Sequence, residues 1–267
     1  MADPKRYIIA GVGGAGIPLA KMLVRQLNFE APGSGMILVD GDSYEEKNKT
    51  RQEFEEFGNK AEVLAAELAP QFVDTTIIGL PKWIIEDSDE AKNYNPDEEE
   101  SVDGSAVAGK VAAVDLLDEN DVVFAVVDNF ATRKILFDAA AQVDNIDVFT
   151  GGNDDGYFGS YIHYQRRNGT DITPNPSTSE RFEEYNNPAD RNPGEMSCQE
   201  RAEIEGGTQI MATNNLVVSV LAMRSHAVVF GGDEPNPSLI YLQLDKGMAA
   251  GEDLRLVKET TKETTGV

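Results

Sequence analysis

The sequence predicts an α/β fold built on a doubly wound sheet that is parallel in its first half and carries antiparallel strands in its second. Short apolar runs suited to buried parallel strands alternate with stretches at helical spacing, and the first run breaks into a glycine-rich turn. A later stretch alternates between apolar and polar residues, as an antiparallel strand does. With 267 residues, 40% of them hydrophobic, the chain can form one large domain over 1–267. We expect 1–150 to hold the parallel strands and 151–267 the mixed ones.

The first predicted strand, Tyr7–Ala10, runs into the glycine-rich turn G-V-G-G-A-G and then into a helix that starts at Ile17. Gly11 and Gly13 allow a tight turn with close backbone approach, and Gly16 allows the helix to pack closely on the strand. Free N–H groups and the helix dipole at that start favour a phosphate. Such a turn can also serve packing alone. Here a strand precedes it and an acidic residue follows at about the expected distance, so we interpret it as a nucleotide-binding loop.

An acidic residue ends the second predicted strand. Met36–Val39 is a buried apolar run followed directly by Asp40-Gly41-Asp42. In a doubly wound sheet a carboxylate at this position reaches the ribose of a bound nucleotide and accepts from both hydroxyls. The alternative is a solvated aspartate in a turn. We favour the ribose contact for Asp40.

Two cations and an amide follow that carboxylate. Asn48 and Arg51 lie within one turn of each other, and Lys60 leads into the helix predicted over Ala61–Leu68. Arg51 offers a planar fork for phosphate oxygens, whereas Lys60 offers a compact point charge. Each cation alone is typical of a solvated surface. Together, and in this order, they indicate a site for a triphosphate rather than a nicotinamide.

The third predicted strand, Asp121–Val127, ends at another carboxylate, Asp128. Ligands bind at the carboxyl ends of strands in open α/β sheets, and a carboxylate there can bridge to a phosphate through Mg²⁺. Asn129 precedes a helix predicted over Ala131–Val143. Its side chain suits a contact with the nucleotide or a simple helix cap, and both interpretations remain open.

The middle of the chain is less regular. Residues 86–105 are acidic and weakly apolar, which predicts an exposed insertion. Helical spacing resumes over Gly109–Leu117. Val148–Thr150 is a short predicted strand that ends in a glycine turn over Gly151–Asn153, and Tyr157–Tyr164 alternates like an antiparallel strand.

His163, within the strand predicted over Tyr157–Tyr164, is expected to be a structural residue without a catalytic part.

The last third of the chain begins with a long connection. The stretch at about 166–207 is rich in proline, asparagine and charge, which predicts a long loop. An apolar helix is expected over Ala212–Val229, followed by a closing hairpin formed by Pro237–Leu244 and Leu254–Val257.

Taken in order, these motifs resemble the ThiF/MoeB/ubiquitin-activating-enzyme family. They are G-x-G-G-x-G, D-x-D, N-x-x-R-Q, a lysine at a helix start, and V-V-D-N, and the resemblance covers roughly Tyr7–Phe230. It implies a Rossmann-like fold that binds ATP and Mg²⁺ and adenylates the C-terminal glycine of a ubiquitin-like or sulfur-carrier protein. The implied nucleotide-binding residues are Gly11, Gly13, Gly14, Gly16, Asp40, Asp42, Asn48, Arg51, Gln52, Lys60 and Asn129. Asp128 is the implied magnesium ligand, and Gly14 is expected nearest the phosphates.

The resemblance also gives the long connection a role. In the family a loop crosses over the active site here, and several members carry on it a cysteine that forms an adduct with the carrier protein. Cys198 matches that position, so the implied catalytic residues are Arg51, Lys60, Asp128 and Cys198. Nearby glutamates disfavour a thiolate, and a lone cysteine is often an inert small hydrophobe. Whether Cys198 reacts stays open.

Composition narrows the partners and the compartment. A formal charge of −24 argues against a nucleic acid or an anionic membrane surface, because both would be repelled. One cysteine excludes an intramolecular disulfide, and the absence of C-x-x-C pairs leaves no structural zinc to expect. With no long apolar run and no basic, apolar leader, a cytoplasmic location is expected.

Two features of the relatives are missing from the sequence. The R-Y-x-R-Q segment that often supplies an arginine to the neighbouring protomer is absent, although a homodimer is still expected by family analogy. We also expect no separate cysteine or carrier-binding domain, and the outline resembles small stand-alone ThiF-like proteins such as those of PRTRC systems. Two other functions stay open. An NAD-dependent oxidoreductase would leave Asn48, Arg51 and Lys60 without a role, and a non-catalytic scaffold would bind nucleotide without chemistry.

Overall fold

The computed structural model describes residues 5–50, 52–98, 107–154, 157–196, 200, 211–231 and 237–256. They form a nine-stranded mixed sheet in the order β11-β10-β8-β7-β6-β1-β2-β3, with β9 paired to β8. The predicted fold class is therefore confirmed. None of the described helices is both long and apolar enough to cross a membrane.

The parallel strands are β1 (Arg6–Ala10), β2 (Gly35–Val39), β3 (Thr76–Leu80), β6 (Val122–Ala125) and β7 (Ile146–Asp154). The chain runs from β1 outwards to β2 and β3, and then returns to the other side of β1 for β6 and β7. The order therefore reverses between β1 and β6. Ligands bind at such a switch point in open α/β sheets, at the carboxyl ends of the strands.

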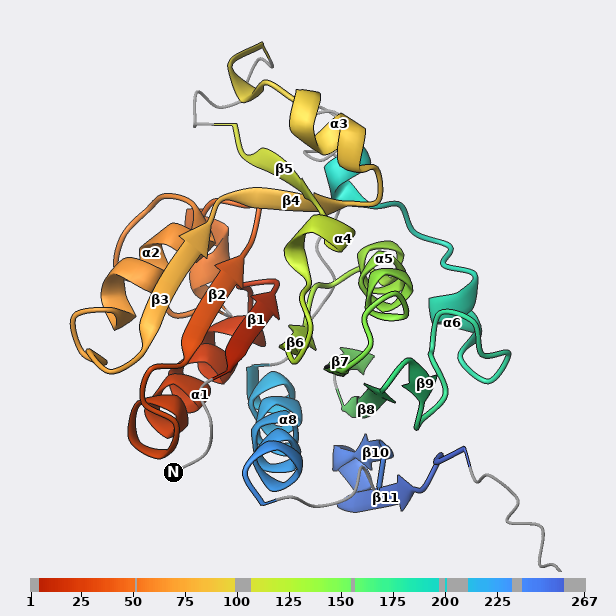
Figure 1. Cartoon of the computed structure of the whole chain (residues 1–267). Coiled ribbons are helices and arrows are strands. Elements are labelled where there is room, and N and C mark those ends of the chain that lie inside the picture. The colour runs from red at the N-terminus through yellow and green to blue at the C-terminus, as the bar shows by residue number, and fades with distance from the viewer. Residues whose placement is uncertain are drawn as a thin grey trace, which may run out of the picture.

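Helices cover both faces of the parallel strands (Figure 1). The helices α1 (Gly16–Glu30), α2 (Lys60–Leu68) and α8 (Met211–Val229) share one core with Tyr7 and Ile9 of β1. On the other face α4 (Ala113–Leu116) and α5 (Phe130–Ala140) pack against Ile8 and Ala10. Successive residues of a strand point to opposite faces, so one short apolar run supplies both cores.

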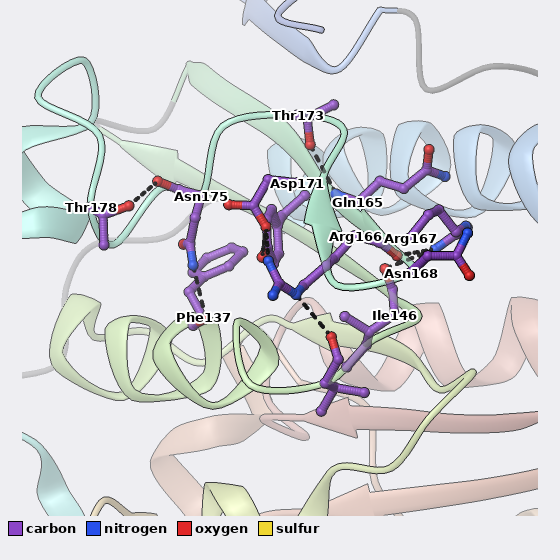
Figure 2. A network of polar contacts seen from close by, with 12 residues as sticks. Phe137, Ile146, Gln165, Arg166, Arg167, Asn168, Asp171, Thr173, Asn175 and Thr178 are labelled. Atoms are coloured by element: carbon purple, nitrogen blue, oxygen red, sulfur yellow. Dashed lines mark hydrogen bonds and ion pairs between the residues drawn. The ribbon is translucent and has the colours of Figure 1, made fainter. Parts of the chain in front are cut away.

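The antiparallel strands are β8 (Phe158–Arg167), β9 (Thr170–Asp171), β10 (Leu239–Gln243) and β11 (Met248–Glu252). Figure 2 shows the turn between β8 and β9, where Arg166 Nη1 lies 2.5 Å from Asp171 Oδ1. The side chain of Asn175 donates to the carbonyl of Phe137 at 3.1 Å. The contact of Asn175 ties the start of the long connection to α5.

Two strands stand apart from the main sheet. β4 (Lys82–Ile85) and β5 (Gly109–Ala112) pair in parallel and lie beside α3 (Ser88–Asn93) at one end of the molecule (Figure 1). The helical prediction for Gly109–Leu117 is therefore wrong in its first half, because backbone pairing with β4 outweighs the local helical spacing. The predicted acidic insertion contains α3 and the 3-10 helix η2 (Pro96–Glu98), and residues 99–106 lie outside the described residues.

Other boundaries also differ from the prediction. β7 continues to Asp154, so the expected glycine turn at Gly151–Asn153 is strand paired with β8. The closing hairpin joins β10 to β11 through the 3-10 helix η4 (Leu244–Lys246), so its second arm precedes the expected Leu254–Val257. The long connection contains α6 (Glu183–Asn186) and the 3-10 helix η3 (Pro193–Glu195).

Candidate functional site

A cavity of about 310 Å³ lies at the switch point of the sheet. Its lining combines the loops that follow β1, β2 and β6 with the start of α2, the end of β7, and part of the long connection. The sequence-predicted residues in that lining are Gly11, Gly13, Gly14, Asp40, Asp42, Asn48, Gln52, Lys60, Asp128 and Asn129. Arg51 and Cys198 lie outside the described residues. Segments far apart in the sequence thus converge on one cavity.

The glycine-rich turn needs its glycines for two reasons. Gly11 has a φ of +93°, and a Cβ there would lie 2.8 Å from the backbone nitrogen of Val127. A Cβ on Gly16 would lie 2.0 Å from the carbonyl oxygen of Gly11, so Gly16 packs behind the turn rather than lining the cavity. The helix α1 begins here without a side-chain cap at Ala15. Its first N–H groups thus have no side-chain cap in the free protein, and an anion could bind them.

Asp40 fixes the conformation of the glycine-rich turn. Its Oδ2 accepts from the N–H of Val12 at 2.6 Å, and its Oδ1 accepts from the N–H of Asp42 at 2.8 Å. Burial raises the pKa of Asp40 to about 6, although Lys60 and the two N–H groups act in the opposite direction. Each carboxylate oxygen has more than one lone pair, so both can still accept from a ligand hydroxyl.

Lys60 is 7% exposed and its Nζ lies 2.8 Å from Asp42 Oδ2. Burial lowers the pKa of this lysine, but the nearby carboxylates of Asp40 and Asp42 outweigh burial and the net pKa is raised. A buried, fully charged ammonium therefore lines the cavity.

Asn59, which is not among the sequence-predicted site residues, positions that lysine. Its Oδ1 accepts from the N–H groups of Ala61 and Glu62 and so caps α2. Its Nδ2 donates to the carbonyls of Asp40 and Asp42 at 2.8 and 3.0 Å. An asparagine directly before a helix start is a recognised cap signal, so the sequence alone could have identified it.

Asn48 lies in the 3-10 helix η1 (Glu46–Thr50), and Gln52 lies just after its end. Asn48 Oδ1 accepts from the N–H of Glu45 at 2.8 Å, and the N–H of Gln52 donates to the carbonyl of Asn48 at 2.8 Å. The Oε1 of Gln52 is buried in the cavity lining and has no hydrogen-bond partner among the described residues. A buried polar atom without a partner is costly, which favours a ligand that would satisfy it.

Asp128 and Asn129 have different surroundings. Asp128 is exposed at the cavity rim and makes no hydrogen bond or ion pair with any described residue. Asn129 Oδ1 accepts from the N–H of Thr132 at 2.8 Å and caps α5, which supports the interpretation as a cap. The described residues contain no cluster of three or more potential metal ligands. A single free carboxylate still fits Mg²⁺, which usually binds one or two carboxylates together with phosphates and water.

Trp83 of β4 is a lining residue that sequence reasoning missed. A Cβ on Gly41 would lie 2.2 Å from the indole ring, so the ring packs directly on the backbone between Asp40 and Asp42. Without a Cβ at Gly41, β4 can reach the ribose end of the predicted site. The segment around Trp83 has no clear periodicity, which is why it gave no signal in the sequence.

Arg133 of α5 also lines the cavity and is 7% exposed. Its Nε and Nη2 donate to the carbonyl of Val127 at 2.9 and 2.7 Å, and Nη2 also donates to the carbonyl of Gly151 at 3.3 Å. Its Nη1 donates to the hydroxyl of Tyr185 at 3.1 Å. This arginine therefore joins the loop before Asp128, the end of β7, and the long connection.

The long connection is anchored beside the cavity by Asp190 and Asn192. The carboxylate of Asp190 accepts from the N–H groups of Phe130 and Ala131 at 2.7 and 2.8 Å, at the start of α5. Asn192 donates to the carbonyl of Ile84 at 2.9 Å. The predicted loop thus crosses from α5 to β4, although the part that carries Cys198 lies outside the described residues.

A sequence profile of the ThiF family matches residues 3–265 of the chain, whereas no curated protein matches it. Among solved structures, E. coli MccB with AMPCPP and MccA aligns at a TM-score of 0.60 with 16% identity, over 94% of this chain and 64% of that one. E. coli MccB with ATP gives 0.61 and 16%, over 94% and 63%. PaaA gives 0.63 and 15%, over 95% and 65%. The chain thus spans less than two thirds of the length of these proteins, and the likeness concerns the fold.

Proposed function

Because the chain belongs to the ThiF family, we propose that it is an ATP-dependent adenylyltransferase that activates the C-terminal carboxylate of a ubiquitin-like or sulfur-carrier protein. The observation that carries this proposal is the cavity itself. It brings a glycine-rich helix start, the carboxylate of Asp40, the buried ammonium of Lys60 and the exposed carboxylate of Asp128 to one switch point. A nicotinamide cofactor would give Lys60 and Asp128 no role.

In this proposal the ribose binds Asp40 and the triphosphate lies along the glycine-rich turn. Gly14 and the start of α1 would contact the phosphates, and Lys60, Asn48 and Gln52 would hold their oxygens together with Arg51. The unpaired Oε1 of Gln52 supports this arrangement, because it would accept from a ligand hydroxyl, or the amide would turn its NH₂ towards a phosphate. Asp128 would hold Mg²⁺, which neutralises phosphate charge when bound.

The proposed reaction is an in-line displacement at the α-phosphorus. The substrate carboxylate attacks the phosphorus and forms an acyl phosphate bond, while the bond to the β-phosphate oxygen breaks and pyrophosphate leaves with the electron pair. Lys60 and Arg51 would spread the charge on the departing pyrophosphate. E. coli MccB, which shares the fold, has been crystallised with ATP and separately with MccA and AMPCPP, which supports the same pairing of ligands here.

Replacing Asp128 tests the proposal most directly. Exchange of labelled pyrophosphate into ATP should appear when a cognate carrier from a panel of ubiquitin-like proteins is added. Asp128→Ala should lower the exchange by about 100-fold or more, since removing one transition-state charge contact typically has that effect. Asp118→Ala is a matched control, because Asp118 precedes the opposite end of β6 and is well exposed. Pyrophosphate exchange that is undiminished in Asp128→Ala would contradict the proposed adenylyltransferase activity.

Calorimetry with ATP and NAD separates the proposal from its alternatives. The adenylyltransferase should bind ATP with Mg²⁺ and ignore NAD, whereas an oxidoreductase would do the reverse. A non-catalytic scaffold would bind ATP yet form no adenylate with any carrier, which an assay for released pyrophosphate would detect.

We propose that the Cys198 thiolate attacks the carbonyl carbon of the acyl-adenylate, so that a C–S bond forms while the bond to AMP breaks and AMP leaves with the electron pair. We also propose that the protein is cytoplasmic, where its thiol stays reduced. Mass spectrometry after incubation with ATP, Mg²⁺ and the carrier should show an added mass on Cys198 that Cys198→Ala abolishes.

We also propose a homodimer by family analogy, which sedimentation equilibrium would test. A monomer at every concentration would exclude it.

A further inference from the structure

We propose that Arg133 receives the substrate carboxylate, on the side of the cavity opposite Lys60. This inference rests on the proposed adenylyltransferase and specifies how that enzyme would recognise a free C-terminus. Three observations carry it: the electrostatic environment of the guanidinium, the donor that its contacts leave over, and its place in the strand order.

The first observation is the electrostatic environment of the buried Arg133 guanidinium. This guanidinium forms no ion pair with any described residue, although it is only 7% exposed. Lys60, the other buried cation in the lining, is paired with Asp42 at 2.8 Å. Burying an unpaired charge is expensive, and carbonyl oxygens and aromatic rings offset only part of that cost. An anion bound in the cavity would offset the rest of the cost of burying the Arg133 charge.

Its contacts leave one donor available. Nε and both N–H groups of Nη2 are engaged by the carbonyls of Val127 and Gly151, and one N–H of Nη1 is engaged by Tyr185. The second N–H of Nη1 therefore has no partner among the described residues. A Cβ on Gly152 would lie 3.2 Å from Nη2 and 3.3 Å from Nη1. A Cβ at position 152 would therefore press on the guanidinium, which lies close to the strand that lines the cavity.

The strand order places Arg133 where the attacking group must come from. Lys60 stands at the start of α2, on the β2 side of β1, whereas Arg133 lies between β6 and β7 on the other side. In-line displacement puts the attacking and leaving oxygens on opposite sides of phosphorus. If pyrophosphate leaves towards Lys60, the carboxylate approaches from the side of Arg133.

The positive charge of Arg133 would help a substrate carboxylate to approach the nucleotide. A carboxylate must remain ionised to attack, yet it approaches a triphosphate inside a chain of formal charge −24. A fixed guanidinium near the attacking oxygen lowers that repulsion and selects a carboxylate over a neutral amide. The cavity would then reject substrates whose C-terminus is blocked.

The test compares a charged and a neutral probe. N-acetyl-Gly-Gly with a free carboxylate and the same peptide as its amide are titrated into the whole protein by saturation-transfer NMR, with and without AMPCPP and Mg²⁺. The wild type should bind the carboxylate at least about tenfold more tightly than the amide, as expected for a charge-assisted hydrogen bond. In Arg133→Gln this preference should fall to about twofold or less.

Two further variants distinguish a role of Arg133 in binding the carboxylate from a role in folding. Tyr185→Phe removes the contact to Nη1 and keeps the charge, so it should retain the preference for the carboxylate. Gly152→Ala crowds the guanidinium without replacing it and should weaken the preference, which keeps the test usable if Arg133→Gln does not fold. Thermal melts check that each variant is native.

An equal preference for the carboxylate in the wild type and Arg133→Gln would overturn the inference, and so would a wild type that does not distinguish the two probes. Failure of the proposed function itself gives another pattern. AMPCPP would then not bind by calorimetry, while the probe arm without nucleotide would still report on Arg133.

Discussion

The ammonium of Lys60 and the carboxylates of Asp40 and Asp42 form a cluster of charges in the cavity lining. Lys60→Ala should lower adenylate formation by about 100-fold or more, because one positive charge near the phosphates is lost. Lys49→Ala should have little effect, since Lys49 is half exposed, pairs with Glu46, and does not line the cavity. Pyrophosphate release measures both variants, and similar losses in the two would exclude a specific role for Lys60.

Asp40 predicts a pH dependence of both stability and binding. Its pKa rises from 3.8 to about 6 on folding, so the folded protein holds this proton more tightly than the unfolded chain. The contribution of Asp40 to the unfolding free energy is present below pH 3.8 and is lost as the pH rises to about 6. Chemical denaturation at several pH values should show this fall, and Asp40→Asn should remove it.

Nucleotide affinity should change in the opposite direction. In the proposed site ionised Asp40 would accept from both ribose hydroxyls, so ATP should bind more weakly as the pH falls through about 6. Titrations of ATP at pH 5 and pH 7.5 measure the difference. A flat profile in the wild type would contradict the ribose contact.

At the scale of single elements, β7 and β8 are joined by a buried polar network. Asp147 lies 2.9 Å from His163 Nε2 and 2.6 Å from Arg167 Nη2, and it is almost fully buried. Burial raises the pKa of Asp147, but His163 and Arg167 outweigh burial and lower it overall. The stability that this carboxylate provides is therefore present at neutral pH and is lost at strongly acidic pH.

Asp147→Asn should lower the unfolding free energy by about 2 kcal/mol, because the change removes the charge of a buried carboxylate that accepts from His163 and Arg167. Asp171→Asn is the comparison, since the carboxylate of Asp171 is more exposed than that of Asp147 and its pair with Arg166 should contribute about 1 kcal/mol or less. Urea denaturation at pH 7 measures both. Equal losses would mean that burial does not set the strength of these pairs.

The elements differ in how far the sequence could predict them. β1, β2, β6 and α2 were predictable because apolar runs end at glycine, acid or cap signals. β4 and β5 were not, because their pairing joins residues 82–85 to 109–112 and depends on contacts that local spacing does not encode. The same reason explains why Asp128 was found and Trp83 was missed. Asp128 closely follows a strong strand, whereas Trp83 lies in β4, whose position depends on its pairing with β5.

At the scale of the whole molecule, the excess of negative charge opposes compaction. A net charge of −24 makes the folded chain repel itself, and salt screens that repulsion over about 10 Å at 0.1 M. Raising sodium chloride from about 0.05 to 0.5 M should therefore increase the melting temperature by several degrees. A control chain with similar mass and near-neutral charge should shift less, and a melting temperature that falls with salt would show that specific ion pairs dominate instead.

Trp83 is the only tryptophan in the chain and it lies against Gly41 in the wall of the cavity. Light absorbed at the red edge of the aromatic band is therefore emitted from this one position. Arrival of a nucleotide should alter the intensity or colour of that emission without any label. Trp83→Phe should show no tryptophan fluorescence at the same wavelengths. Binding rates could therefore be followed in real time from the fluorescence change and assigned to this single residue.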